Sequence, residues 1–443
     1  MESPTSRPVA MGNVPGKTGV SEVDPETITP QKEPMSRTIR LLMALPALAG
    51  CSGGGMGTEP ILEELPRALS EAETRLIDGG NRFTFDLFRE ATRALPNDSN
   101  AFLSPLSASM ALGMALNGAG GETFDSMRQA LRFGDLPLEQ INQGYKSLTE
   151  LLTGLDRSTE MLVANSVWLA QGFAMESEFQ EAARTWFGAE AEALDFGSPA
   201  ALSRINGWVA EATRNRIPKL LDQIRPEEVA FLVNALYFKG RWRVAFDPKQ
   251  TQPQPFHAAD GSTTNVPMMF LKEGVRYART QSYEAAELLY GNGAFAMVIV
   301  LPAEGVTLAG LVAGMDAAGW SDLAGRLAEN NVQLRLPRFK LEVTRELKDD
   351  LSGLGMGIAF DPNRADFYGI ADVRPERLYL TRVLQKTFVE VNEEGTEAAA
   401  ATAVGVGVTS APPTMEVNRP FLFAIRERLS GTVVFMGQVN RLP

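Results

Sequence analysis

The sequence predicts an α+β protein whose sheets are large and mostly antiparallel. Helical periodicity is concentrated in the first half of the chain, and strand-like apolar runs dominate the second half. The two kinds of element do not alternate in the regular β-α order that a parallel sheet would require. At 443 residues, of which 44% are hydrophobic, the chain can bury a large core, as one big domain or as two ordinary ones.

Composition excludes several kinds of function. The net charge is −12 and there is no basic run, so a nucleic acid is a poor partner. The single cysteine, Cys51, excludes an internal disulfide framework and any paired-cysteine metal or redox site. The single histidine, His257, excludes a site that needs two imidazoles, and its polar, proline-flanked surroundings favour an exposed loop or strand edge. We therefore expect no catalytic residues, no metal and no cofactor.

The first 34 residues show no sign of a fold. Residues 1–34 are rich in Pro, Ser and Thr and lack periodicity, which indicates disorder or a misassigned upstream extension. Their stretch Gly-Asn-Val-Pro-Gly-Lys-Thr at 12–18 has one residue too few between its glycines for a phosphate-binding loop, and no buried strand precedes it. We therefore reject nucleotide binding at this position.

Residues 35–50 resemble the signal peptide of a bacterial lipoprotein. Two arginines precede a short apolar run, and Leu-Ala-Gly-Cys at 48–51 resembles the lipobox. The resemblance implies cleavage before Cys51, lipidation of Cys51, and a flexible tether over residues 51–69. The mature protein would then be extracytoplasmic, either lipid-anchored to the bacterial membrane or secreted. The alternative is an ordinary apolar segment with an incidental cysteine, and the residues that precede Met35 argue for it, because a signal must lie at the terminus.

Helices are expected early in the globular part, which we place at residues 70–443. A first helix carries Leu87 and Phe88 on one face and stops before Pro96. A second begins at Ser104-Pro105, because proline suits the first helical turn, and stops near Gly118. Further helical stretches are expected at 122–132, 137–154, 176–187, 199–214 and 347–354.

Strands are expected to dominate the later part of this domain. Apolar runs predict strands at 161–170, 230–237 and 295–301, and residues 332–341 alternate between apolar and polar side chains as one strand.

The stretch from Val389 to Asn418 combines the properties of a strand and a loop. Past Gly395 its residues are small and uncharged except for Glu397. In a strand, every second residue points to the same face. On one of the two faces the residues are β-branched or small and could face a core, namely Thr396, Ala398, Ala400, Thr402, Val404, Val406 and Val408. Pro412-Pro413 then ends any ladder, because proline has no N–H to donate. A plain linker is the alternative, but only some thirty residues follow, which favours a loop presented by one domain.

Five stretches resemble signatures of the serpin family, in the family's order and at plausible spacing. They are Asn100-Ala-Phe-Leu-Ser-Pro-Leu-Ser107 with the helix that follows it, Val233-Asn-Ala-Leu-Tyr-Phe-Lys-Gly-Arg-Trp242, Phe388-Val-Glu-Val-Asn-Glu-Glu-Gly-Thr-Glu-Ala-Ala-Ala-Ala401, Asn418-Arg-Pro-Phe-Leu-Phe423 and Phe435-Met-Gly-Gln-Val439. The resemblance covers about residues 70–443. It implies the serpin fold, with large, mostly antiparallel sheets, about nine helices and an exposed reactive-centre loop.

The resemblance also implies a function, that of an irreversible inhibitor of serine proteases rather than an enzyme. The target protease cuts the exposed loop, and the part before the cut inserts into the central sheet as a new strand, here residues 396–408. The covalent acyl-enzyme complex is trapped before it can hydrolyse. Serpin loop insertion is an established example of strand addition and of stored strain being released. We expect the chain to act as a monomer.

The hinge of the loop matches the family at Glu394, Gly395, Thr396, Glu397, Ala398, Ala399, Ala400 and Ala401. In the family, small residues here distinguish inhibitory members from non-inhibitory ones, so inhibition is expected. The family's usual loop length places the reactive bond at Thr409–Ser410, with Val408 as the next candidate. No lysine or arginine lies between Glu397 and Asn418, so elastase-like or subtilisin-like targets are expected rather than trypsin-like ones.

Five further positions are carried over from the family. Ser104, Ser107, Asn234 and Gln385 match a polar cluster beneath the point at which the sheet opens, and Trp242 matches a tryptophan at the top, where insertion begins. Taken alone, each of these residues could instead be a helix cap or a core residue whose polar atoms are all hydrogen-bonded. Gln385 stands where many members have a histidine; glutamine both donates and accepts hydrogen bonds, so the cluster can survive without titrating near neutral pH.

Two other functions stay open. A non-inhibitory serpin would act as a binding or scaffold protein and form no covalent complex with a protease. A hydrolase would have to use His257, since the sequence has no Gly-x-Ser-x-Gly elbow.

Overall fold

The computed structural model describes residues 60–330, 332–396 and 412–443. Local capping chemistry sets where its first helices begin. Ser70 and Glu73 exchange hydrogen bonds between side chain and backbone as a capping box, which satisfies N–H groups that the helix itself leaves unpaired. Ser104 caps the next helix and Pro105 occupies its first turn, as the sequence predicts. The nine α-helices of the described residues are α1 Glu71–Arg93, α2 Pro105–Leu116, α3 Gly121–Ala130, α4 Leu138–Gly154, α5 Ser177–Phe187, α6 Pro199–Ala212, α7 Leu308–Gly314, α8 Ala317–Arg326 and α9 Lys348–Leu351.

Three sheets account for the strands, and neighbouring strands pair mostly in antiparallel fashion. The central sheet has the order β12 Phe339–Glu346, β13 Arg382–Asn392, β14 Gly395–Thr396, β4 Ala230–Arg241, β2 Thr159–Ala170 and β3 Glu190–Leu194. A seven-stranded sheet has the order β1 Ala101–Leu103, β17 Val433–Val439, β16 Phe421–Glu427, β9 Phe295–Pro302, β8 Tyr283–Leu289, β7 Arg276–Arg279 and β10 Ala328–Glu329. A four-stranded sheet has the order β15 Thr414–Glu416, β11 Gln333–Pro337, β6 Thr263–Leu271 and β5 Gln252–His257.

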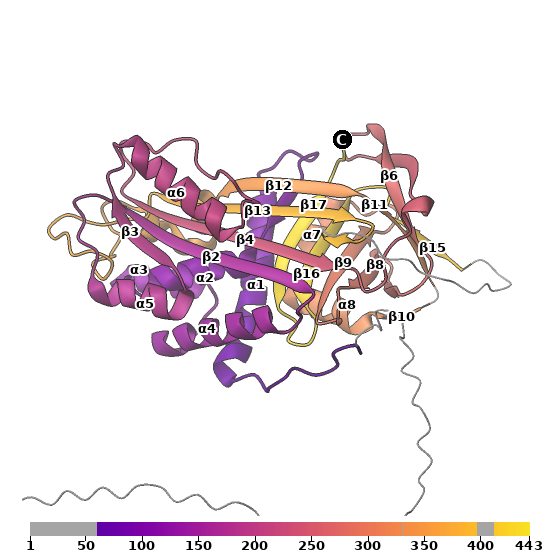
Figure 1. Ribbon diagram of the computed structural model, residues 1–443, viewed down its shortest axis with the longest axis horizontal. Coiled ribbons are helices and arrows are strands. Elements are labelled where there is room, and N and C mark those ends of the chain that lie inside the picture. Colours follow the sequence, from indigo (N-terminus) through magenta and orange to yellow (C-terminus); the bar gives the residue numbers. More distant parts are fainter. Residues whose placement is uncertain (1–59, 331, 397–411) are drawn as a thin grey trace, which may run out of the picture. The chain divides into compact units, whose positions relative to one another are not determined.

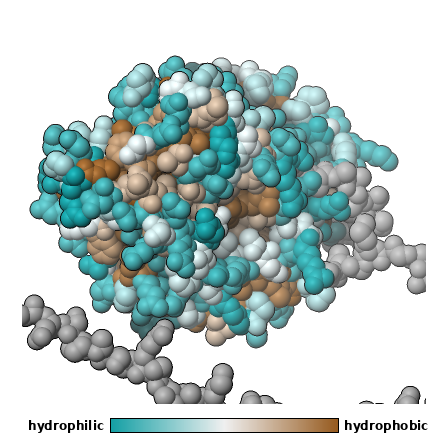
Figure 2. Space-filling view, turned by 60° about the vertical axis from the view of Figure 1, so that its left-hand side comes forward, coloured by the Kyte–Doolittle hydropathy of each residue, from teal (hydrophilic) through white to brown (hydrophobic). Residues whose placement is uncertain are grey.

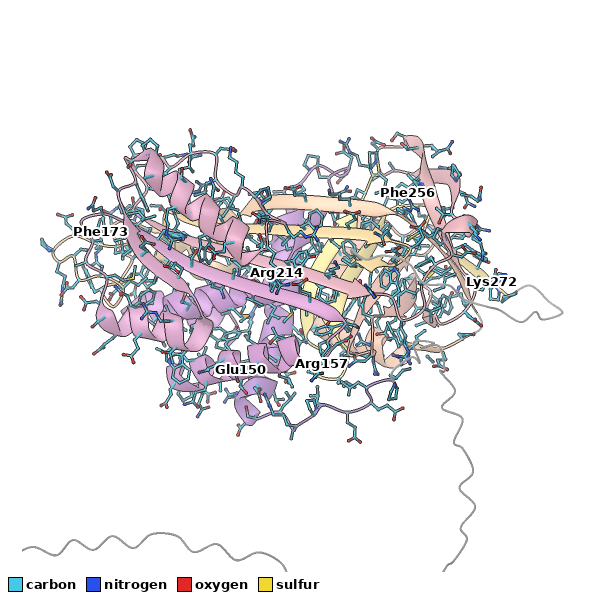
Figure 3. The ribbon with its side chains drawn as sticks, viewed as in Figure 1. Glu150, Arg157, Phe173, Arg214, Phe256 and Lys272 are labelled. Atoms are coloured by element: carbon cyan, nitrogen blue, oxygen red, sulfur yellow. The ribbon has the colours of Figure 1, made fainter. Side chains whose placement is uncertain are left out.

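Helices cover both faces of the central sheet. On one face, α6 lies over β2 and β4 (Figure 1). Its Ile205 and Val209 belong to a hydrophobic cluster with Trp168 and Phe231 that is separate from the main core. Beyond the end of α6, Arg214 forms an ion pair with Glu160 of β2 (Figure 3). On the other face, α2 packs against β2 and β4. The central strands are therefore buried on both sides, and polar groups among them need partners within the protein.

The main core lies between α1, α2 and the seven-stranded sheet. Strands β9, β16 and β17 are buried along their whole length. Phe102 of β1 stacks on Phe435 of β17, with ring centroids 5.0 Å apart. This apolar layer packs against α2 through β17 and against the central sheet through β1.

Two expectations about local structure were wrong in part. Residues 332–341 contain the whole of β11 and the start of β12, which belong to different sheets, instead of one strand. The break falls at Pro337-Arg338, where Pro337 has no N–H to continue a ladder and the Arg338 N–H donates to Pro267 O. The expected helix at 347–354 is α-helical for only one turn, α9, and continues as the turns η2 Ser352–Met356 and η3 Gly357–Phe360, with a kink at Gly355, whose φ is 97°.

The surface is predominantly hydrophilic on the face shown in Figure 2, with small scattered apolar areas. In the described residues, none of the helices combines the length and the apolar character that crossing a membrane requires.

Candidate functional site at the opening of the central sheet

Strands β13 and β4 of the central sheet pair in parallel, as do β2 and β3 at its edge. Residues Arg382–Phe388 of β13 pair with Phe231–Tyr237 of β4. Above this stretch the two strands separate, and the two-residue strand β14 lies between them. Thr396 is antiparallel to both, opposite Val391 on one side and Gly240 on the other. We call this place, where β4 and β13 separate around β14, the sheet opening.

Gly395 is required for the chain to enter the sheet opening. Its φ is 154°, and a Cβ added to it would lie 2.1 Å from Gly240 O, far inside van der Waals contact. Any other residue would push the backbone away from β4. The glycine therefore sets the position at which the chain turns back between the strands.

The Thr396 side chain is anchored beneath the sheet opening. It is 1% exposed, and its Oγ1 lies 2.8 Å from the Tyr290 hydroxyl. The Tyr290 ring stacks on Trp242 at 4.5 Å between centroids, and Trp242 Nε1 donates to Asn392 O at 2.8 Å. Burial raises the pKa of Tyr290 far above its usual range, more than the hydrogen bond with Thr396 lowers it. The hydroxyl therefore stays protonated and remains available to Thr396.

An ion pair holds the backbone just before the hinge. Glu393 is 4% exposed, and Arg338 donates to its two oxygens from Nε and Nη2, with 2.7 Å between Nε and Oε2. Thr251 donates a further hydrogen bond to the carboxylate, and the Phe246 N–H donates to Glu393 O. Burial alone would raise the pKa of Glu393, but the hydrogen bonds from Arg338 and Thr251 outweigh it and hold the pKa below its ordinary value.

A buried polar cluster lies farther down the same strands. Gln385 Nε2 donates to Asn234 Oδ1 and to Ser104 O, each at 2.8 Å, and Gln385 Oε1 accepts from the Ser104 N–H. Asn234 Nδ2 in turn donates to Ser107 and to Asn165 Oδ1. All five residues are at most 1% exposed. The cluster ties β13, β4 and β2 to the start of α2.

The chain beyond the hinge returns to a different sheet. β15 begins at Thr414 and pairs parallel with β11 of the four-stranded sheet, and the Gln333 N–H donates to Pro413 O. The described residues on the two sides of 397–411 thus belong to different sheets. The predicted hinge residues from Glu397 to Ala401 and the predicted reactive bond at Thr409–Ser410 lie outside the described residues, as does Cys51.

Comparison with known proteins decides the family. The family model described as Serpin (serine protease inhibitor) matches residues 78–442. The chain belongs to the serpin family. It is 35% identical to Iripin-2 of Ixodes ricinus over 385 residues, which cover 84% of this chain and 95% of that protein.

Two solved structures show the same fold. Tengpin, a thermophilic serpin crystallised in its native state, matches with a TM-score of 0.79 and 29% identity, covering 87% of this chain and 97% of that one. Human thyroxine-binding globulin in complex with its hormone matches with a TM-score of 0.77 and 27% identity, covering 84% and 99%. The predicted serpin fold, α+β with large, mostly antiparallel sheets and nine α-helices in the described residues, is confirmed. The family's description is that of protease inhibitors and not of enzymes.

The structure brings the predicted residues of this serpin into two groups. Ser104, Ser107, Asn234 and Gln385 meet in the buried polar cluster. Trp242 lies at the sheet opening with Glu394, Gly395 and Thr396, since its backbone N–H donates a hydrogen bond to Glu394 O. The functional roles assigned to these residues stay predictions.

Sequence reasoning missed four residues of these groups. Asn165 carried a usable signal, because it is a lone amide in the apolar run 161–170. Tyr290, Arg338 and Glu393 carried none, because their partners are distant in the chain. In the described residues no three His, Cys, Asp or Glu side chains gather where they could hold a metal ion.

We predict that Arg338→Gln destabilises the serpin at neutral pH by about 1–3 kcal/mol, because it leaves the buried Glu393 carboxylate without its cation. Folding lowers the pKa of Glu393 below 4.5, so the ion pair contributes stability above that pH and loses it as the pH falls through the folded pKa. The difference in unfolding free energy between the two proteins should therefore shrink below about pH 4.5.

Urea denaturation at neutral and acidic pH measures this difference. Arg364→Gln serves as the control, because Arg364 forms an exposed ion pair with Glu122 and should change stability by less than about 1 kcal/mol. A loss for Arg338→Gln that is equal at both pH values would contradict the prediction.

Proposed function

We propose that this serpin is a suicide-substrate inhibitor of serine proteases. The observation that carries the proposal is the position of Thr396, which already pairs with β4 and β13 at the sheet opening. After cleavage of the loop, residues 396–408 would continue between the two strands and replace one parallel pairing by two antiparallel ones. The attached protease would be carried along and trapped as the acyl-enzyme.

The register of the flanking strands supports this insertion. Continued beyond Thr396, it would place Thr402 opposite both Asn234 and Gln385, and those two residues already pair with each other. A threonine hydroxyl both donates and accepts, so it could replace the Asn234–Gln385 hydrogen bond that strand separation breaks. The register would extend to Val406 opposite Ala230, the first residue of β4.

The side chains of the segment fit such a strand. In the inserted strand, every second residue from Thr396 to Val408 would face the main core. All of these residues are alanine, threonine or valine. A charge at one of these positions would cost several kcal/mol in the buried sheet. The sequence thus favours an inhibitory member of the family.

We further propose that the reactive bond is Thr409–Ser410 and that the targets are elastase-like or subtilisin-like enzymes. The absence of lysine and arginine from Glu397 to Val417 disfavours a trypsin-like enzyme, which needs a cation in its pocket. Val408 is the next candidate for the residue before the cut.

A protease panel tests the function. With an elastase-like or subtilisin-like protease we expect an adduct that survives SDS, together with a released C-terminal peptide that begins at Ser410. The same protease with its catalytic serine replaced by alanine should give no adduct, because no acyl-enzyme can form. Mixtures that run as two intact proteins with every active protease would contradict the proposal.

A non-inhibitory serpin that binds a ligand or serves as a scaffold is the second candidate. Its support is the likeness to human thyroxine-binding globulin, whose structure holds thyroxine. Such a protein would be cleaved in the loop without retaining the protease. The hydrolase alternative loses support, because His257 is exposed at the end of the edge strand β5 and hydrogen-bonds to Thr263.

The location of the protein belongs to the same proposal. We propose a monomeric bacterial protein whose residues 35–50 act as a lipoprotein signal and whose Cys51 carries the lipid, which places the serpin domain of residues 70–443 outside the cytoplasm. Membrane fractionation of the full chain and of its Cys51→Ala variant tests the anchor, since only the first should sediment with membranes.

A further inference from the structure

One cavity of the described residues lies apart from the sheet opening and has a size that suits a small ligand. Its volume is 610 Å³, and it lies where the C-terminal end of α1 meets α7 and the start of β16. In this region α7 packs against β9 and β16 (Figure 1). A volume of several hundred Å³ is typical of small-molecule sites. None of its lining residues belongs to β4, β13 or the hinge.

Positive charge dominates the lining of this cavity. Arg89, Arg93 and Arg419 line it, and no aspartate or glutamate does among the described residues. This contrasts with the net charge of −12 of the whole chain. The cavity is therefore a local site at which an anion is favoured over a cation.

Arg419 is the arginine best placed to bind an anion. Its Nη2 donates to Pro302 O at 2.8 Å, which fixes the guanidinium at the cavity wall. Within the described part of the chain it forms no ion pair, so its charge is not neutralised. A guanidinium held in this way retains free donors in a planar arrangement that suits a carboxylate.

The charge of Arg89 is only partly neutralised. Its Nη1 donates to Asp86, but the same carboxylate also accepts two hydrogen bonds from Arg132. Two cations thus share one anion. The Arg89 Nε is also buried without an acceptor among the described residues. Arg93, by contrast, is paired with Glu90 and is mostly exposed, so it contributes little.

The rest of the lining is largely apolar. Val306, Leu308 and Val312 come from α7 and the turn before it, and Leu95, Pro302 and Pro420 also line the cavity. A ligand that fills this space needs an apolar body as well as an anionic head. The two requirements together describe an amphipathic carboxylate.

We propose that this cavity binds a small amphipathic carboxylate of the fatty-acid type, with its head at Arg419 and its apolar chain against α7. A bound ligand would contact α1, α7 and the residues before β16, and it would stabilise the folded protein by an amount that grows with the logarithm of ligand concentration above Kd. The proposal does not depend on the inhibitory function, because the cavity and the sheet opening share no residue.

Calorimetric titration of the full chain with decanoate tests the proposal. We expect saturable binding, and binding of the neutral decanamide that is at least about tenfold weaker, because it cannot form the charge-assisted hydrogen bond with Arg419. Arg419→Gln should weaken decanoate binding by about tenfold and leave decanamide binding within about twofold. Arg364→Gln, which removes an exposed arginine elsewhere, should change neither.

A second variant tests the position of the apolar chain. Ala309 lies on the exposed rim of the cavity on α7, so Ala309→Trp should fold normally while obstructing the cavity. Loss of decanoate binding in this variant, with an unchanged melting temperature in the absence of ligand, supports the assignment. Equal binding of decanoate and decanamide, or undiminished binding in both variants, overturns it.

Discussion

Cleavage of the loop is expected to raise the melting temperature of the protein by roughly 10 °C or more. Of the described residues, Gly395 and Thr396 occupy the sheet opening, and below them β13 pairs directly with β4. After cleavage, the strand 396–408 would gain partners on both sides. About a dozen additional hydrogen bonds, at a net 0.5–1.5 kcal/mol each, contribute on the order of 10 kcal/mol.

The size of the rise follows from the size of the domain. One kcal/mol shifts the melting temperature of a domain of 150–250 residues by about 2–4 °C, and of a larger domain by less. Because the uncleaved form would be the less stable one, it must be protected by a kinetic barrier. In the proposed mechanism, the parallel pairing of Arg382–Phe388 with Phe231–Tyr237 and the buried polar cluster would supply that barrier, since both must break before the strands separate.

Differential scanning calorimetry of intact and loop-cleaved protein measures the rise. The cleaved sample is prepared with a small amount of a protease that the serpin does not trap, and the cut is located by N-terminal sequencing. A cleaved sample that melts at or below the temperature of the intact protein would rule out strand insertion, and the proposed mechanism with it.

Local chemistry explains what could be predicted from the sequence. Ser104-Pro105 marks the start of α2 correctly, because a cap and a proline in the first turn act within a few residues. The apolar runs at 161–170 and 230–237 become β2 and β4, because strands buried on both faces are apolar along their length. The alternation of side chains along the hinge predicts that Thr396 faces the core, and its side chain is buried.

Partners that are distant in the chain explain what could not be predicted. Arg338 reaches Glu393 only because the chain changes sheets at Pro337, and nothing in the alternating pattern of 332–341 marks that change. Tyr290 meets Thr396 across 106 positions of sequence. Such contacts are set by how the sheets stack, which local periodicity does not encode.

The sheet opening also connects these missed residues to the predicted ones. Trp242 was expected at the top of the sheet, but its ring is positioned by stacking on Tyr290, and Tyr290 is also the partner of Thr396. Arg338 holds Glu393, which lies two residues before Gly395. The hinge is therefore fixed from both sides, by an ion pair before the glycine and by a hydroxyl pair after it.

The largest effect of a single substitution is expected for Thr396→Arg, which should convert the inhibitor into a substrate. The Thr396 side chain is 1% exposed and bonded to Tyr290, so an arginine there would bring an unpaired charge against a neutral tyrosine and the Trp242 ring. Burying that charge costs several kcal/mol, which corresponds to a loss of trapping of at least about 100-fold. The loop itself stays available to the protease, so cleavage should continue at an unchanged rate.

The matched control is Thr396→Ser, which keeps the hydroxyl that Tyr290 contacts and should retain inhibition within about threefold, because only a methyl group is lost. The number of inhibitor molecules consumed per protease molecule inactivated distinguishes the two variants, and circular dichroism confirms that both are folded. Full inhibition by Thr396→Arg would show that the chain does not enter the sheet at this residue. Cleavage should raise the melting temperature of the Thr396→Ser variant but not that of Thr396→Arg. Because the two proteins differ only in the side chain that must enter between β4 and β13, this result would tie insertion and inhibition to the same step.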